Sequence, residues 1–279
     1  MRLPAGLAAT WRDEEAWLAA LPDLAAACAA TWGLALEEPL PTPRSLVVPA
    51  GDVVLKLNAP GHADADHEAD ALAAWDGQGA ARLVARDDER RALLLERCRP
   101  GTTLATTSPE APELVARLVE RLRRTPAAGQ SFRHLADEAD RWAVVVPERW
   151  EAAGRPFERG LLDRALAVFA GVDRGATRLV NQDLHGWNVL AAEREPWLAI
   201  DPKPLVGEPE LDGVGPLRNA AFAGGTTEVQ RWLAPLVALG LDRERLCGWG
   251  LAHALAWGAD DEARWSEESV AAARAIADA

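Results

Sequence analysis

The hydrophobic and polar positions follow two different periods along the chain. Up to about residue 97, short β-branched and leucine-rich runs alternate with polar turns. From residue 98 onward the apolar residues recur mainly every three or four positions, which is the period of amphipathic helices. The pattern predicts an α+β protein with a small N-terminal lobe that contains an antiparallel sheet, residues 1–97, and a mainly helical C-terminal lobe, residues 98–279.

The first lobe is predicted to hold a small sheet and several helices. Alanine- and leucine-rich stretches predict helices at 11–20 and 23–32, and Pro22 between them is expected to end the first. A further helix is expected at 66–75. Four short apolar runs predict strands, at 45–48, 53–57, 82–86 and 92–96. The first two strands flank Ala50-Gly51-Asp52, which is typical of a hairpin turn.

The second lobe is predicted to be helical apart from one polar interruption. The helical stretches lie at about 110–124, 132–151, 157–169, 227–239, 242–258 and 265–277. The interruption covers 179–190. Two four-residue apolar runs, Val189–Ala192 and Trp197–Ile200, which a polar turn joins, lie at its end and after it. These two runs predict a β-hairpin directly after the polar loop.

The polar loop and the hairpin carry the strongest chemical signal. Asp183 and Asn188 are five positions apart in the loop, and Asp201 follows the second strand of the hairpin. A hairpin returns the chain, so we expect Asp201 to lie across from Asn188. Phosphoryl transfer uses such a set: one carboxylate orients the attacking hydroxyl, while an asparagine and a second aspartate hold Mg²⁺. The spacing therefore predicts Asp183 as the catalytic base and Asn188 and Asp201 as metal ligands.

The scarcity of lysine adds a candidate for binding phosphate. The chain has 30 lysine and arginine residues, but only two, Lys56 and Lys203, are lysines. Lys56 falls on a predicted strand, where a compact ammonium group can pair with the α- and β-phosphates of a nucleotide if a carboxylate orients it. Glu68, on the helix after that strand, is the expected orienting residue. The adenine is expected between the lobes, against the backbone of Glu96 to Cys98.

Composition and charge exclude several classes of protein. The net charge of −13 argues against nucleic acid as a partner, because binding to phosphates requires a positive face, and it favours a cationic small molecule. The three cysteines have neither disulfide nor zinc spacing. The N-terminus has no apolar signal region and no stretch is long enough to span a membrane, which predicts a cytoplasmic protein.

Four motifs resemble those of the aminoglycoside and hydroxyurea phosphotransferases. They are Val53–Lys56, Trp75–Ala80, Asp183-Leu184-His185-Gly186-Trp187-Asn188 and Trp197–Glu208. The resemblance implies a two-lobed, protein-kinase-like fold, the use of ATP with Mg²⁺, and transfer of the γ-phosphoryl group to a hydroxyl of an aminoglycoside such as streptomycin. One departure stands in the catalytic loop, which in this family usually opens with His-Gly-Asp. Here Asn181 and Gln182 occupy the first two of these positions.

A cationic acceptor would be bound by carboxylates beside aromatic rings. The candidates in the helical lobe are Glu208, Asp212, Trp249 and Asp260. The acceptor stays open between an aminoglycoside, hydroxyurea and an amino sugar of the glucosamine type. An inactive module that binds nucleotide or a small molecule is the alternative from another class. Either a monomer or a dimer is compatible with the sequence.

Overall fold

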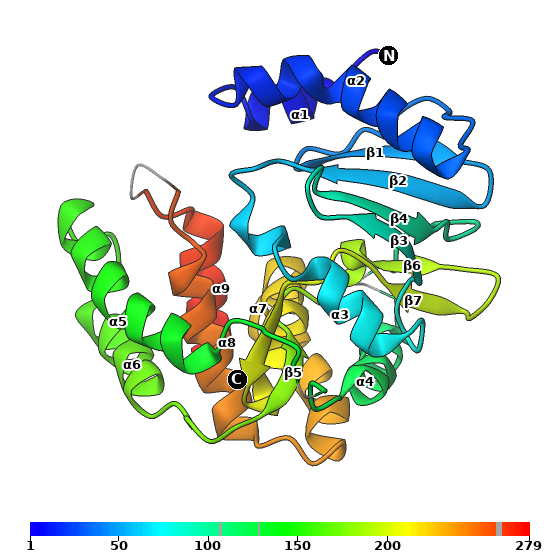
Figure 1. Cartoon of the computed structure of the whole chain (residues 1–279). Helices are drawn as coiled ribbons and strands as arrows, with labels where there is room; N and C mark the ends of the chain where they lie inside the picture. The colour runs from blue at the N-terminus through cyan, green and yellow to red at the C-terminus, as the bar shows by residue number, and fades with distance from the viewer. Residues whose placement is uncertain (106–107, 128, 261–263) are drawn as a thin grey trace. The chain divides into compact units, whose positions relative to one another are not determined.

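The computed structural model describes residues 1–105, 108–127, 129–260 and 264–279 of the chain, which forms two compact units (Figure 1). Unit 1 comprises Met1–Gly101 and Ala191–Asp201, and unit 2 comprises Thr102–Leu190 and Pro202–Ala279. The lobe boundary at residues 97 and 98 stays a prediction. The sequence pattern did not indicate that Ala191–Asp201 belongs with the N-terminal residues.

Unit 1 is built on a four-stranded antiparallel sheet. Its strands are β1 (Ser45–Ala50), β2 (Val53–Asn58), β3 (Leu83–Asp87) and β4 (Ala92–Glu96), in the order β1-β2-β4-β3. The hairpin between β1 and β2 is confirmed, because Ala50 pairs with Val53 across a two-residue turn. Gly51 in this turn has a φ of +62°, which glycine adopts without steric cost.

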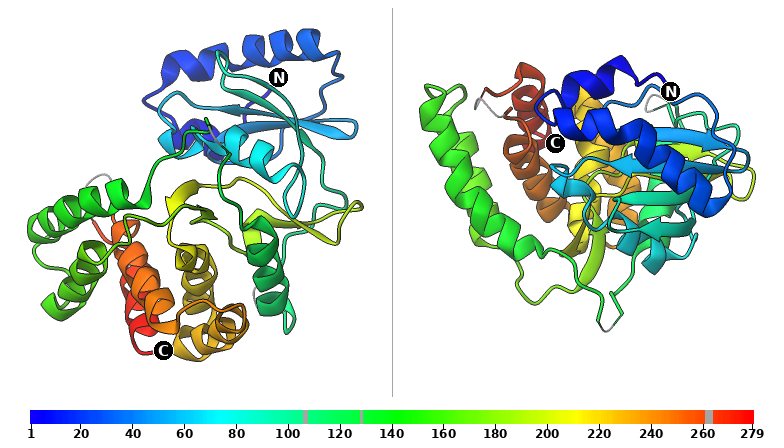
Figure 2. Two further views of the ribbon diagram at one scale, coloured as in Figure 1. Left: turned by 60° about the horizontal axis from the view of Figure 1, so that its bottom comes forward. Right: turned by 45° about the horizontal axis from the view of Figure 1, so that its top comes forward.

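Helix α2 (Glu15–Trp32) follows the short helix α1 (Ala5–Thr10) and lies over the sheet in all views (Figures 1 and 2). The prediction that Pro22 ends a helix was wrong, since α2 continues through it. Proline removes only one backbone donor and leaves the carbonyl of the preceding turn unpaired. Buried side chains of α2 before and after Pro22 pack in one apolar cluster with residues of the strands, and this packing stabilises the helix across the proline. These side chains are Trp17, Leu21, Ala25 and Cys28.

Unit 2 contains six further α-helices within the described part of the chain. They are α4 (Ala111–Leu122), α5 (Leu135–Ala152), α6 (Arg159–Ala170), α7 (Val214–Ala238), α8 (Arg243–Ala256) and α9 (Glu267–Ala277). Helix α9 packs against α7 and α8, and α6 packs against α5 and α8 (Figure 2). The core of this unit includes the fully buried rings of Phe169, Trp232 and Trp249. In these helical positions the tryptophans are packing residues.

Helix α7 is about twice as long as the sequence predicts. The expected helix at 227–239 is its second half, and the first half begins at Val214, after the 3₁₀ turn Pro209–Gly213. The two halves meet at a kink, where Gly224 and Gly225 have non-helical dihedral angles. The sequence signal of the first half is weak because it contains glycine and proline. Its buried face, which includes Val214, Leu217 and Ala220, nevertheless keeps helical spacing.

Four short strands flank the polar loop in the sequence. The expected hairpin is present as β6 (Val189–Ala191) and β7 (Trp197–Ala199). A second antiparallel pair, β5 (Arg178–Asn181) and β8 (Pro204–Gly207), was not predicted. Helix α3 (Glu68–Trp75) of unit 1 follows the 3₁₀ turn Ala63–Ala65 and confirms the helix expected at 66–75. Among the described residues, no helix is long and apolar enough to cross a membrane.

Candidate active site

The polar loop begins where β5 ends, and Asn181 fixes its backbone. The Asn181 side chain is completely buried, and its Oδ1 accepts hydrogen bonds from the backbone nitrogen atoms of Asp183, at 3.2 Å, and Lys203, at 3.0 Å. Its own backbone nitrogen donates to Asp212 Oδ1 at 2.7 Å. One asparagine therefore joins the start of the loop to the segment before β8 and to the 3₁₀ turn before α7.

Asp183 is held by cationic and polar groups of unit 2. Its Oδ1 accepts a hydrogen bond from Arg218 Nη2 at 2.7 Å and lies 3.4 Å from His185 Nε2. Burial by itself would raise the pKa of Asp183, but the hydrogen bond from His185 and the charges of His185, Arg218 and Lys203 lower this pKa below its ordinary value. The carboxylate is therefore ionised at neutral pH.

Asn188 is oriented by the same carboxylate. Its Nδ2 donates to the backbone oxygen of Asp183 at 3.1 Å and to Asp183 Oδ2 at 3.3 Å. These bonds place the amide nitrogen on the side of Asp183. Among the hydrogen bonds formed by the described residues, none uses Asn188 Oδ1, so this oxygen is available to a hard cation such as Mg²⁺.

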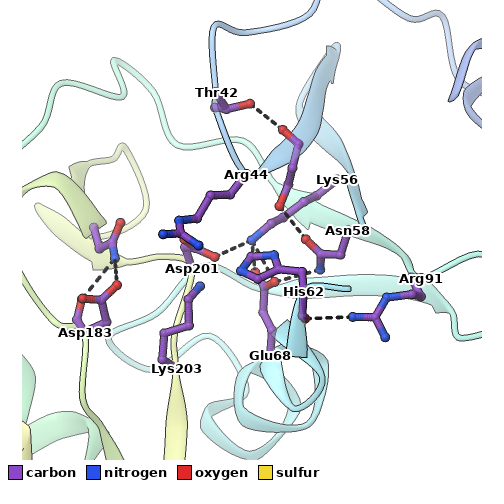
Figure 3. A network of polar contacts seen from close by, with 12 residues as sticks. Thr42, Arg44, Lys56, Asn58, His62, Glu68, Arg91, Asp183, Asp201 and Lys203 are labelled. Atoms are coloured by element: carbon purple, nitrogen blue, oxygen red, sulfur yellow. Dashed lines mark hydrogen bonds and ion pairs between the residues drawn. The ribbon is translucent and has the colours of Figure 1, made fainter. Parts of the chain in front are cut away.

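Lys56 and Glu68 form the buried ion pair that the sequence predicts (Figure 3). Lys56 Nζ lies 2.7 and 2.8 Å from the two carboxylate oxygens of Glu68 and 2.6 Å from Asp201 Oδ1. Burial would lower the pKa of Lys56, but the charges of Asp201 and Glu68 outweigh burial and raise it above its ordinary value. The lysine is therefore a permanent cation between two carboxylates.

Two polar side chains complete the surroundings of Glu68. Asn58 Nδ2 donates to Glu68 Oε2 at 3.1 Å, and Ser45 Oγ donates to Asn58 Oδ1 at 2.6 Å. Glu68 is fully buried, so these bonds satisfy a charge that would otherwise be costly to bury. Asp201 has a φ of +48°, a conformation that few residues other than glycine adopt and that often marks functional positions.

Glu96 and Cys98 occupy the segment where adenine was expected. The Glu96 side chain accepts two hydrogen bonds from Arg194, each 2.8 Å long, and Arg194 also donates to the backbone oxygens of Gly77 and Ala80. The backbone nitrogen of Glu96 donates to Arg82. Within the described residues no hydrogen bond uses the backbone nitrogen of Cys98, so this amide is the one available to a nucleotide base.

Three of the four expected acceptor residues lie in the interior of unit 2. Glu208 accepts hydrogen bonds from Trp249 Nε1 at 3.0 Å, from Arg245 and from the backbone of Asp173. Trp249 is fully buried. These contacts stabilise the packing of α8, and they give no support to a role of Glu208 or Trp249 in substrate contact, which stays an untested prediction.

Asp212 and Asp260 differ sharply in their surroundings. Asp212 is buried, and burial raises its pKa to about 7, although the hydrogen bond from Asn181 and the charge of Arg123 oppose this shift. Its location under the loop suits a role in holding Asn181 better than contact with a substrate. Asp260 is exposed and forms an ion pair with Arg264 at 3.0 Å. Its assignment to the acceptor site also stays a prediction.

Sequence reasoning missed Arg218, His253 and Arg194. Arg218 contacts Asp183, and His253 contacts Arg218 and Gln182. Arg194 donates a hydrogen bond to the backbone oxygen of Gly77, in the turn that follows α3. No short motif contains them, because each lies tens of residues away from its partner in the sequence. Arg218 and His253 stand in mostly apolar stretches, which could have indicated them, whereas Arg194 stands between two glutamates in a predicted polar turn and has no such signal.

The sequence matches a known family over most of its length. Residues 37–268 match the family model described as aminoglycoside/hydroxyurea antibiotic resistance kinase. The chain is 36% identical over 275 residues to streptomycin 6-kinase of Streptomyces griseus, which covers 91% of this chain and 89% of the relative. It is 37% identical over 276 residues to hydroxyurea phosphotransferase of Kitasatospora aureofaciens, covering 92% and 78%.

Solved structures support the same fold. Choline kinase LicA from Streptococcus pneumoniae superposes with a TM-score of 0.67 at 13% identity and covers 93% of this chain and 99% of its own. A thermostable mutant of aminoglycoside phosphotransferase APH(4)-Ia, in a complex with AMP-PNP and hygromycin B, gives a TM-score of 0.55 at 14% identity, with coverage of 92% and 98%. The two-lobed, protein-kinase-like α+β fold is thereby confirmed. The residue pattern and the match over residues 37–268 agree, and the chain belongs to the aminoglycoside/hydroxyurea antibiotic resistance kinase family.

Proposed function

We propose that this kinase transfers the γ-phosphoryl group of ATP to a hydroxyl of an aminoglycoside, with streptomycin as the first candidate, and that it does so in the cytoplasm. The observation that carries the proposal is the pairing of Asp183 with Asn188 in one loop. It unites an ionised carboxylate with an amide whose oxygen accepts no hydrogen bond from the described residues. The identity to streptomycin 6-kinases from two Streptomyces species supports the choice of acceptor.

Asp183 would act on the acceptor hydroxyl. Arg218 occupies Oδ1, so Oδ2, whose one hydrogen bond from the described residues is the 3.3 Å contact with Asn188, is the oxygen that would orient the hydroxyl and take its proton. A carboxylate with a lowered pKa is a weak base. That suits phosphoryl transfer through a loose transition state, in which orientation matters more than early removal of the proton.

Lys56 of unit 1 would bind the phosphates of the nucleotide. Lys56 would contact the α- and β-phosphates, with Glu68 holding its ammonium group in place. Asn188 and Asp201 would supply oxygen ligands to Mg²⁺, which neutralises the charge of the phosphates when it is bound. The backbone at Cys98 would receive the adenine ring, next to Glu96.

The acceptor has a second candidate. The hydroxyurea phosphotransferase is as similar to this chain as the streptomycin kinases are, so hydroxyurea belongs in the same test. The net charge of −13 favours the aminoglycoside, because streptomycin is cationic and hydroxyurea is neutral. An amino sugar such as glucosamine completes the set of acceptors.

The test is release of ADP from ATP and Mg²⁺ with each acceptor. We expect streptomycin to give the highest kcat/KM, and Asp183→Asn to lower kcat by several orders of magnitude, because that change removes the group that orients the hydroxyl. Asp163→Asn is the matched control, since Asp163 pairs with Arg159 on the exposed face of α6. ADP release at the background rate with all three acceptors, while ATP still binds, would favour the inactive nucleotide-binding module instead.

A further inference from the structure

Arg218 on α7 connects the catalytic loop to the interior of unit 2. Its two terminal nitrogen atoms point to different partners: Nη2 lies 2.7 Å from Asp183 Oδ1, and Nη1 lies 3.2 Å from Nδ1 of His253 on α8. Arg218 and Asp183 each keep only 13% of their side-chain surface exposed. The planar fork of a guanidinium group can serve two partners in fixed directions, which the point charge of a lysine cannot.

The partners of His253 fix its protonation state. Arginine can only donate hydrogen bonds, so Nδ1 of His253 must be the acceptor in its contact with Arg218. Nε2 then carries the proton and donates to Gln182 Oε1 at 3.2 Å. Burial and the charge of Arg218 lower the pKa of His253 well below its ordinary value, which agrees with a neutral ring.

Aromatic rings fix the same two side chains from the sides. The guanidinium carbon of Arg218 lies 5.4 Å from the centre of the Trp257 ring, within the range of a cation–π contact. The ring of His253 lies 4.4 Å from that of Trp257 and meets Trp142 edge-on at 5.9 Å. Arg218 therefore has little freedom to turn away from Asp183.

From these contacts we propose that Arg218 is a positioning residue for Asp183, held in register by neutral His253 and Gln182. The continuous chain of hydrogen bonds runs from Gln182 through His253 and Arg218 to Asp183 Oδ1. It begins and ends in the catalytic loop, at neighbouring residues, so it closes a ring that anchors the loop to α7 and α8. Because the hydrogen-bonded chain ends on Oδ1, it leaves Asp183 Oδ2, which accepts the 3.3 Å hydrogen bond from Asn188, to orient the acceptor hydroxyl.

This inference rests on the proposed function, because a positioning role implies a reaction at Asp183. It also explains why Gln182 can replace the glycine that usually precedes the catalytic aspartate in this family. A glycine has no side chain that could accept this hydrogen bond from His253 Nε2. Gln182 is buried and makes that contact with its side chain.

The kinetic test compares Arg218→Lys and Arg218→Gln with the same changes at Arg231. Arg231 lies on the same helix and pairs with Glu228, outside the loop. Both Arg218 variants should lower kcat about 10²-fold, the usual cost of a misplacement of about 1 Å, with an unchanged KM for ATP. The Arg231 variants should keep wild-type kcat. Wild-type kcat in Arg218→Lys would show that the planar guanidinium group is not required. Wild-type kcat in Arg218→Gln would overturn the proposal.

Two NMR signals test the arrangement without turnover. In protein with ¹⁵N-labelled histidine at pH 7, the signal of His253 should show a protonated Nε2 and an unprotonated Nδ1; the opposite tautomer would overturn the proposal. The ¹³C signal of the Asp183 carboxyl, identified by its loss in Asp183→Asn, should shift in Arg218→Lys and stay in place in Arg231→Lys. An unshifted carboxyl signal in Arg218→Lys would refute the contact between Arg218 and Asp183. If both signals behave as expected but no acceptor is phosphorylated, the proposed acceptors fail while the inferred contacts stand.

Discussion

The buried cluster of Lys56, Glu68 and Asp201 allows a quantitative prediction. Lys56→Met should destabilise unit 1 by about 3–5 kcal/mol, the usual cost of removing one partner of a buried ion pair. Glu68 has no exposed surface, and the one hydrogen bond that the described residues would still give it is the 3.1 Å bond from Asn58. The remaining carboxylates, Glu68 and Asp201, would also repel each other.

Glu68→Gln should cost less, about 1–3 kcal/mol, because Lys56 keeps its 2.6 Å contact with Asp201 and the amide can still accept from Asn58. The double variant Lys56→Met with Glu68→Gln removes both buried charges. It should therefore be more stable than the sum of the single effects predicts, with a coupling energy of about 2–3 kcal/mol.

The assay is urea unfolding followed by tryptophan fluorescence, together with hydrogen exchange of the amides of β2 and β4, which reports on unit 1 directly. The matched control is the cycle of Arg97→Met and Glu37→Gln, an exposed pair of the same unit, for which no measurable coupling is expected. If the effects of the Lys56 and Glu68 changes add to within about 0.5 kcal/mol, the two charges do not stabilise each other and the reasoning fails.

Two further predictions concern the support of the catalytic loop. Gly215→Ala should lower kcat about 10²-fold, because the new Cβ would lie 2.9 Å from the backbone nitrogen and oxygen of Leu184 and would displace Asp183. The control is Gly160→Ala, whose Cβ meets no atom within 4 Å. Equal kcat values in the two variants would contradict the close contact at Gly215. Asp212 has a pKa of 3.8 when exposed and about 7 in the fold, so the stability it contributes is complete below pH 3.8 and is lost as the pH rises through 7. Urea unfolding between pH 4 and pH 8 should show a smaller loss of stability in Asp212→Asn than in the wild type, and parallel curves would refute a buried, protonated Asp212.

The fold was predictable where local signals agreed. The strands of unit 1 follow from β-branched runs that are bounded by turn residues, and each observed strand lies within two residues of its predicted ends. The sequence misled at Pro22, where packing of α2 on the sheet outweighs the missing backbone donor. The sequence contains no local signal for β8, because Pro204–Gly207 becomes a strand only through pairing with β5, more than 20 residues away.

The residues of the candidate site were likewise predictable where a local signal marks them and not where composition was the only guide. Asp183, Asn188 and Lys56 could be found because a family motif or a residue scarcity marks them within a few positions. Glu208 and Trp249 were chosen from composition, and the structure places both in a buried cluster with Arg245. A carboxylate beside an aromatic ring satisfies the chemistry of a cation-binding site equally well when the cation is an arginine of the same chain.

The departure at Asn181 and Gln182 shows how far a sequence motif can decide function. As a motif, the loss of the usual His-Gly pair motivates the alternative of an inactive module, although the other residues expected in the site are all present. Both residues are buried, and both use their side chains to hold the loop: Asn181 binds two backbone amides, and Gln182 accepts from His253. The motif describes one solution to the problem of fixing an aspartate on a loop, whereas the physical requirement is only that the loop be fixed. The contacts of Asn181 and Gln182 meet that requirement through Lys203 and His253, partners that the loop sequence does not contain.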